Sequence, residues 1–101
     1  MPARRLRYLA EARREVDDAL QWYLARSRQA AEAFLRELEH AAVLIAESLG
    51  VWPRYEGESR RYVLRRFPFD IIYRESGRTI EVIALAHHKR KPGYWHRRTA
   101  G

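Results

Sequence analysis

The residues best suited to chemistry lie near the end of the chain, in the stretch AHHKRKPGYWHRR at residues 86–98. His88 can transfer protons near neutral pH, and Lys89 and Arg90 can neutralise anionic oxygen atoms. Tyr94 can stack on an exposed base. Such groups could serve metal-independent cleavage of RNA by its own 2′-hydroxyl, a reaction in which two protons must move and a crowded phosphorane must be stabilised.

Two more cations, Arg61 and Arg65, share one face of the predicted strand at residues 60–67 (RRYVLRRF). On that face they could hold phosphate oxygens, since the arginine side chain binds phosphate with a two-pronged fork. They could equally remain solvated, or bind the carboxylates of an acidic protein partner.

The residues at the C-terminal end also have structural interpretations. His87 and His88 follow one another on a strand, so they face opposite sides of the sheet. Strict alternation predicts that His88 shares a side with Ile80, Val82, Ala84 and Ala86. One histidine then packs under the helices or at the sheet end. We expect Trp95 to pin the C-terminal segment to the core, and Arg97 and Arg98 to be solvated charges in a disordered tail.

Composition and charge narrow the class of protein. The chain has 101 residues, of which 47% are hydrophobic and 33% charged, which suits one globular domain over residues 1–101. It has no cysteine, and the histidines alone make a weak zinc site, so we expect no metal and no cofactor. The net charge of +7 falls entirely on residues 53–101, since eight arginines and eight acids cancel in residues 1–52. This asymmetry favours a polyanionic partner.

The helices and strands that must position these groups can be predicted from hydrophobic periodicity. Residues 4–9 suggest a short strand, and residues 11–27 and 29–49 repeat apolar side chains at helical spacing, with Gly50 and Pro53 ending the second helix. Strands follow at residues 60–67, 69–74 and 79–88, with a turn at Ser76-Gly77. The fold class is therefore α+β in the order β-α-α-β-β-β. A helical hairpin packs on an antiparallel sheet of about four strands, in which the apolar last strand is central.

The order of these elements, together with the block from Arg60 to Trp95, resembles the RelE/ParE superfamily of toxins from type II toxin–antitoxin systems. The block joins a basic strand, a Phe-Pro-aromatic break, an Ile-Ile-Tyr-Arg strand, and an apolar strand that ends in Ala-His before Pro-Gly-Tyr-Trp. The resemblance implies a toxin with one of two mechanisms. One branch cuts messenger RNA on the ribosome, and the other inhibits DNA gyrase without chemistry of its own.

Carried over residue by residue, the resemblance implies a catalytic set for the nuclease branch. The set comprises His88, Arg90, Tyr94 and Arg61, and the cations Arg65, Lys89 and Lys91 complete an anion-binding surface. One position departs from the nuclease pattern, since Asp70 stands where that branch has a phosphate-supporting arginine. A carboxylate there repels phosphate, which favours the gyrase branch.

These observations leave three hypotheses of function. The first is growth arrest by ribosome-dependent cleavage of messenger RNA, and the alternatives are gyrase inhibition and an attenuated toxin that only binds its antitoxin. In each case the resemblance implies a cognate antitoxin with an acidic C-terminal segment, and a toxin–antitoxin hetero-oligomer. We expect a cytoplasmic protein with no membrane contact, because no signal peptide is visible and the longest apolar run, residues 41–46, is too short to span a bilayer.

Overall fold

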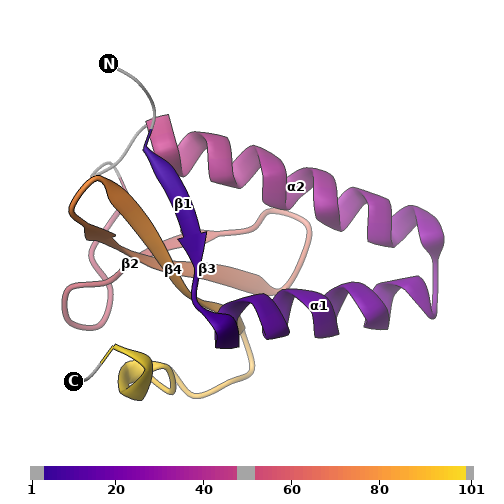
Figure 1. Cartoon of the computed structure of the whole chain (residues 1–101). Coiled ribbons are helices and arrows are strands. Elements are labelled where there is room, and N and C mark those ends of the chain that lie inside the picture. The colour runs from indigo at the N-terminus through magenta and orange to yellow at the C-terminus, as the bar shows by residue number, and fades with distance from the viewer. Residues whose placement is uncertain (1–3, 48–51, 100–101) are drawn as a thin grey trace.

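The computed structural model describes residues 4–47 and 52–99, which form a two-helix hairpin packed on a four-stranded sheet (Figure 1). The elements follow the predicted order β-α-α-β-β-β, with one short 3₁₀-helix, η1, near the C-terminal end. Their bounds are β1 Arg5–Tyr8, α1 Ala10–Leu24, α2 Arg28–Glu47, β2 Arg60–Val63, β3 Phe69–Ser76, β4 Thr79–His87 and η1 His96–Arg98. Within the described ranges, no helix is long and apolar enough to cross a membrane.

The helical hairpin forms because each helix carries small or apolar residues at helical spacing along one side. In α2 these residues are buried: Ala31, Phe34, Leu38, Ala41 and Ile45. Only residues 25–27 connect the two helices, and the Ser27 hydroxyl accepts a hydrogen bond from the N–H of Ala30 at 3.1 Å. The short connection makes the helices adjacent and antiparallel. The predicted helix end at Leu49 and Gly50 lies outside the described residues.

The sheet has the strand order β1-β4-β3-β2, so β4 is central, as the sequence predicts. Strand β3 is antiparallel to both of its neighbours, β2 and β4, and Gly77, with φ +61°, lies in the turn between β3 and β4. The predicted antiparallel sheet needs one correction, because β1 pairs with β4 in parallel. Parallel neighbouring strands need a long crossover connection. Between β1 and β4 this connection starts with the helical hairpin and continues through β2 and β3.

Strand β2 is shorter than predicted, since it ends at Val63 rather than at residue 67. The N–H of Leu64 donates to the carbonyl of Phe69 at 3.0 Å, so the chain turns back immediately after the strand. Pro68, which has no N–H, lies within this turn. As a result Arg65 lies in the connecting segment and does not share a strand face with Arg61.

A β-bulge in β4 changes which side chains share a face of the sheet. Ile72 pairs with Ala84 whereas Tyr73 pairs with Val82, so Ile83 is an extra residue in β4. An extra residue reverses the alternation of side chains beyond it. The expectation that His88 shares a face with Ile80 and Val82 is therefore wrong, although the part of it that concerns Ala84 and Ala86 holds.

The two faces of the sheet bury two separate clusters. The first lies under the helices and includes Phe34, Tyr73, Ile80 and Val82. The second lies on the opposite face and joins the far side of β3 and β4 to the C-terminal segment: Ile72, Ile83, Ala84, Ala86 and Trp95. Figure 1 shows this arrangement, with the helices on one side of the sheet and the yellow C-terminal segment on the other. Trp95 is 2% exposed, so it anchors the segment as predicted.

Tyr73 provides a test of the helix-side core. Its ring is fully buried and its hydroxyl has no hydrogen-bond partner among the described residues. Burial raises the pKa of Tyr73 to about 12. Because the pKa in the folded chain lies above the value of about 10 in the unfolded chain, the folded state loses stability as pH rises from about 10 to about 12, and below that range this group does not make stability depend on pH.

We expect Tyr73→Phe to leave the free energy of unfolding at pH 7 unchanged or to raise it by up to about 1 kcal/mol, because it removes an unpaired buried hydroxyl. In an absorbance titration of tyrosinate, the variant should lose a component near pH 12. Tyr55→Phe is the control and should retain that component. A loss of stability above 1 kcal/mol in Tyr73→Phe would show that the hydroxyl has a partner.

Candidate functional site

The centre of the site is Asp70 on β3, whose carboxylate lies on the sheet face opposite the helices. Asp70 is 8% exposed. The His88 Nε2 lies 2.8 Å from its Oδ1, and an Arg61 guanidinium nitrogen lies 3.8 Å from its Oδ2. The Arg61 guanidinium also lies 4.2 Å from the centre of the Tyr55 ring. An ionised carboxylate only accepts, so Nε2 of His88 donates and the imidazole keeps Nδ1 as its free nitrogen.

The register of the sheet explains why these groups meet. Asp70 pairs with Val63 on one side and with Ala86 on the other. Arg61 and His88 each lie two residues from those partners along their own segments, so both project to the same face as Asp70. This meeting depends on the bulge, because without it His88 would point towards the helices.

A cavity of about 400 Å³ opens at this point, with Tyr55 and Trp95 as aromatic walls. Three of the four residues predicted as catalytic line it: Arg61, His88 and Arg90. The position at which the family pattern departs, Asp70, lines it as well. The cavity thus brings together two imidazoles, of His87 and His88, two guanidinium groups and one carboxylate.

Tyr94, the fourth predicted catalytic residue, is directed elsewhere. Its hydroxyl donates to Oε2 of Glu15 at 2.6 Å, and the Arg90 guanidinium lies 3.7 Å from the centre of its ring. Burial, followed by the hydrogen bond to Glu15, raises the pKa of Tyr94. The Tyr94 phenol is therefore a neutral, bound group and not a free acid or base.

Glu15 on α1 is a residue that sequence reasoning missed. Its carboxylate accepts hydrogen bonds from the N–H of Leu85 at 3.1 Å and from the Arg98 guanidinium at 2.8 Å and 3.0 Å, besides that from Tyr94. The Arg90 guanidinium lies 3.8 Å away. All these partners are at least 70 residues distant in sequence, so no local pattern identifies them.

The reason for this cluster is that β1 stops early. Strand β1 ends at Tyr8, which pairs with Val82, so the edge of β4 beyond that residue has no strand beside it. Glu15 accepts from the N–H of Leu85, and the Arg98 guanidinium donates to the carbonyl of Ile83 at 3.1 Å. Side chains thus satisfy backbone groups that a longer β1 would have paired.

The prediction that Arg97 and Arg98 belong to a disordered tail needs correction. His96–Arg98 form η1, and the side chain of Arg98 is only 15% exposed because it lies between Glu15 and β4. Gly93 makes the path possible, since its φ is +86° and a Cβ there would lie 2.9 Å from the ring of His96. The density of charge in the sequence predicts a solvated end, but the partly buried carboxylate of Glu15 pairs with one of its arginines, Arg98.

The cations predicted to complete an anion surface do not meet at one place. Lys89 and Lys91 are exposed in the segment after β4, near the cavity at Asp70. Arg65 lines a different cavity, beside α2. In the described part of the chain, no three His, Asp or Glu side chains come together as a metal ion requires.

Comparison with known proteins gives a consistent result. A family model described as "ParE toxin of type II toxin-antitoxin system, parDE" matches residues 6–92, a range that includes Glu15, Asp70 and His88. Among solved structures, a chain of the "Chromosomal ParDE TA system from P. aeruginosa" is similar, with a TM-score of 0.72 and 16% sequence identity. The similarity covers 84% of this chain and 96% of that one, and at this identity it concerns the fold. A comparison with curated proteins gave no match.

The role of Glu15 can be tested by removing its carboxylate. We expect Glu15→Ala to lower the free energy of unfolding by about 2–4 kcal/mol, because Arg98 and the N–H of Leu85 lose their acceptor in a partly buried place. Amide hydrogen exchange at Leu85 should accelerate, and trypsin should cut faster after Arg98.

Asp17→Ala is the matched control, since Asp17 is an exposed acid on the same helix. Glu15→Gln should lose less stability than Glu15→Ala, because the amide oxygen still accepts. Unchanged exchange at Leu85 in Glu15→Ala would contradict this account of the β4 edge.

Proposed function

Since this chain belongs to the ParE toxin family of type II toxin–antitoxin systems, we propose that it arrests growth by binding and inhibiting DNA gyrase rather than by cleaving RNA. One observation carries the proposal, namely that the groups suited to RNA cleavage are held by carboxylates of the chain itself. Arg61 and His88 contact Asp70, and Arg90 and Tyr94 contact Glu15.

The cavity at Asp70 is poorly suited to phosphate for electrostatic reasons. A phosphate bound there would face a nearly buried carboxylate, and repulsion between like charges is strong where water is scarce. The two guanidinium groups that line the cavity each already have a carboxylate within 4 Å. Stabilising a phosphorane would require these contacts to break first.

Tyr94 supports the same conclusion. A general acid works best when its pKa lies near the working pH, whereas burial and Glu15 raise the pKa of this phenol further above neutrality. A binding toxin requires none of this chemistry, only a stable surface. The Glu15 cluster stabilises that surface by holding the C-terminal segment on the sheet.

A second candidate, ribosome-dependent cleavage of messenger RNA, is favoured by one feature of the same cavity. His88 is oriented by a carboxylate and its side chain is 44% exposed, so Nδ1 could accept a proton from a ribose hydroxyl. Arg61 and Arg90 line the same cavity and could contact the phosphate after rearrangement. A third possibility, an attenuated toxin, would show neither activity.

One experiment separates these candidates. Purified chain is added to gyrase in a DNA supercoiling assay, and in parallel messenger RNA is mapped for cleavage in cells that express the chain. We expect inhibited supercoiling and intact messenger RNA, and we expect His88→Ala to inhibit gyrase as strongly as the unmodified chain does. Normal supercoiling at excess toxin would sink the proposal, and cleavage that depends on His88 would establish the second candidate.

A toxin of this family has a cognate antitoxin, and we propose that an amphipathic, acidic segment of it binds beside α1. A cavity of about 400 Å³ there has an apolar lining that includes Ala19, Trp22 and Phe69. Charged and polar side chains of both kinds surround it: Glu15, Asp18, His87 and Arg90. An amphipathic helix could insert its apolar face into such a groove. Trp22 is 53% exposed, which is unusual for so large a side chain. We place the pair in the cytoplasm, where gyrase acts.

We expect Trp22→Ala to weaken antitoxin binding at least tenfold while leaving the melting temperature of the toxin nearly unchanged, because the side chain is mostly solvated before binding. Val43→Ala, which truncates an equally exposed residue on α2, is the control. Isothermal titration calorimetry with the cognate antitoxin gives both affinities. Equal affinities for Trp22→Ala and the unmodified chain would place the antitoxin elsewhere.

A further inference from the structure

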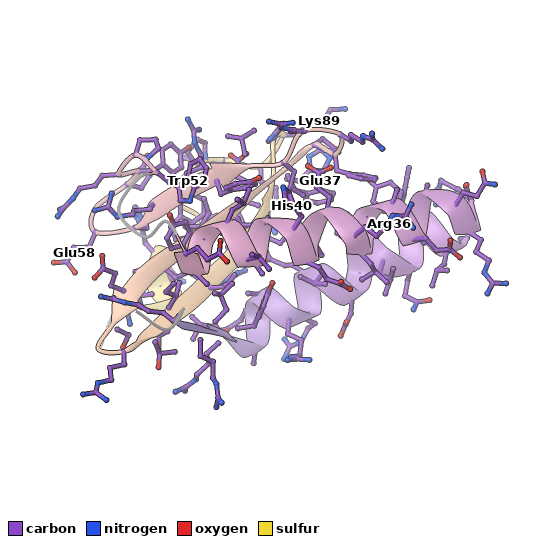
Figure 2. All side chains as sticks on the ribbon, turned by 90° about the horizontal axis from the view of Figure 1, so that it is seen from above. Arg36, Glu37, His40, Trp52, Glu58 and Lys89 are labelled. Carbon is purple, nitrogen blue, oxygen red and sulfur yellow. The ribbon has the colours of Figure 1, made fainter. Side chains whose placement is uncertain are left out.

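A second cluster of cations lies on the helix side of the molecule, away from Asp70. Arg36 and His40 on α2 face Arg65 and Arg66 in the segment after β2, and the four side chains line a cavity of about 260 Å³. Figure 2 labels Arg36, Glu37 and His40 along α2, seen from above. The sequence suggested an anion-binding role for Arg65 alone among them.

Glu37, which also lines this cavity, holds the cluster together. Its carboxylate accepts hydrogen bonds from the backbone N–H groups of Arg65 and Arg66, the second at 3.2 Å. The acid is thus engaged with the backbone of the connecting segment and not with a guanidinium group. It fixes the segment against α2, and the side chains of both arginines stay exposed.

The cations of this cluster carry uncompensated charge. Across residues 4–47 and 52–99, no carboxylate lies within 4 Å of the guanidinium groups of Arg36, Arg65 or Arg66. Three arginines against one acid, Glu37, leave two net positive charges with His40 neutral and three with His40 protonated. The cavity at Asp70 differs, because there each arginine has an acidic partner.

The lining of the cavity indicates the class of ligand. Its only apolar contributions are Ala33 and the buried ring of Tyr62, so it offers no pocket for the aromatic or aliphatic anchor that most protein partners insert. Guanidinium groups bind phosphate oxygens in a bidentate manner. Arg36 and His40 are four residues apart on a helix, about 6 Å along its axis, so they can contact successive groups of a chain of phosphates.

We propose that Arg36, His40, Arg65 and Arg66 bind the phosphodiester backbone of a nucleic acid. Contacts of this kind fix the position of a protein on a nucleic acid and are independent of base sequence. The proposal does not depend on gyrase inhibition, although a toxin that acts on gyrase meets duplex DNA there. It is tested without gyrase, so either proposal can fail alone.

The experiment measures binding of the full chain to two fluorescein-labelled probes, a 20-base-pair DNA duplex and a 20-nucleotide single-stranded RNA, by fluorescence anisotropy across a salt series. We expect Arg36→Ala to weaken binding about 3- to 10-fold and the double variant Arg65→Ala, Arg66→Ala to weaken it more than 10-fold. The slope of log K against log salt should fall by about 1 for each arginine removed. Glu37 binds backbone groups only, so these variants keep the segment in place.

The matched control is the double variant Arg14→Ala, Arg78→Ala, which removes the same charge from exposed arginines elsewhere in the chain. Tighter binding of the DNA probe identifies a duplex as the source of the phosphodiester, and tighter binding of the RNA probe identifies a single strand. Equal losses in the control and cluster variants would overturn the proposal. It would also fail if the cluster variants lose affinity for a polyglutamate peptide yet bind both nucleic acids as the unmodified chain does.

Discussion

The structure depends on how the edge of β4 is completed where β1 ends. A four-residue strand pairs with β4 only as far as Val82, and beyond it the backbone groups that face this edge, rather than β3, need another partner. Glu15 from α1 and Arg98 from the C-terminal segment supply those partners. Because Glu15 also binds Arg98 directly, the same carboxylate joins the first helix, the central strand and the end of the chain. The C-terminal segment is consequently a structural layer that covers the second face of the sheet.

The β-bulge at Ile83 decides what that layer covers. It lets β4 place Val82 under the helices and Ala86 on the opposite face within one short strand. His88 follows the second alternation and therefore reaches Asp70. A regular strand would have sent the imidazole towards the helices and left Asp70 without that partner. The bulge thus determines the composition of the cavity.

The sequence predicts those features that have a local signal. Helical spacing located α1 and α2, and the apolar run at residues 82–86 identified the central strand. The same run hid the bulge, because side chains that are apolar on both faces carry no alternation to be broken. The direction of β1 and the partners of Glu15 could not be predicted. Both depend on contacts between residues at least 70 positions apart, for which a single sequence carries no local signal. Asp70 was recognised as a departure from the family pattern, but its partners, Arg61 and His88, required the register.

Carboxylates also determine which of the many cations are available to a ligand. The excess positive charge falls on the second half of the chain, yet Asp70 and Glu15 pair with Arg61, Arg90 and Arg98 there. Glu37 instead accepts from backbone N–H groups, which leaves the guanidinium groups of Arg65 and Arg66 without a carboxylate partner in the described part of the chain. An acid that binds a guanidinium cancels a charge, whereas an acid that binds the backbone positions the charges of its neighbours. The cations beside α2 are therefore available to a polyanion, although the sequence concentrates its candidate chemistry at the C-terminal end.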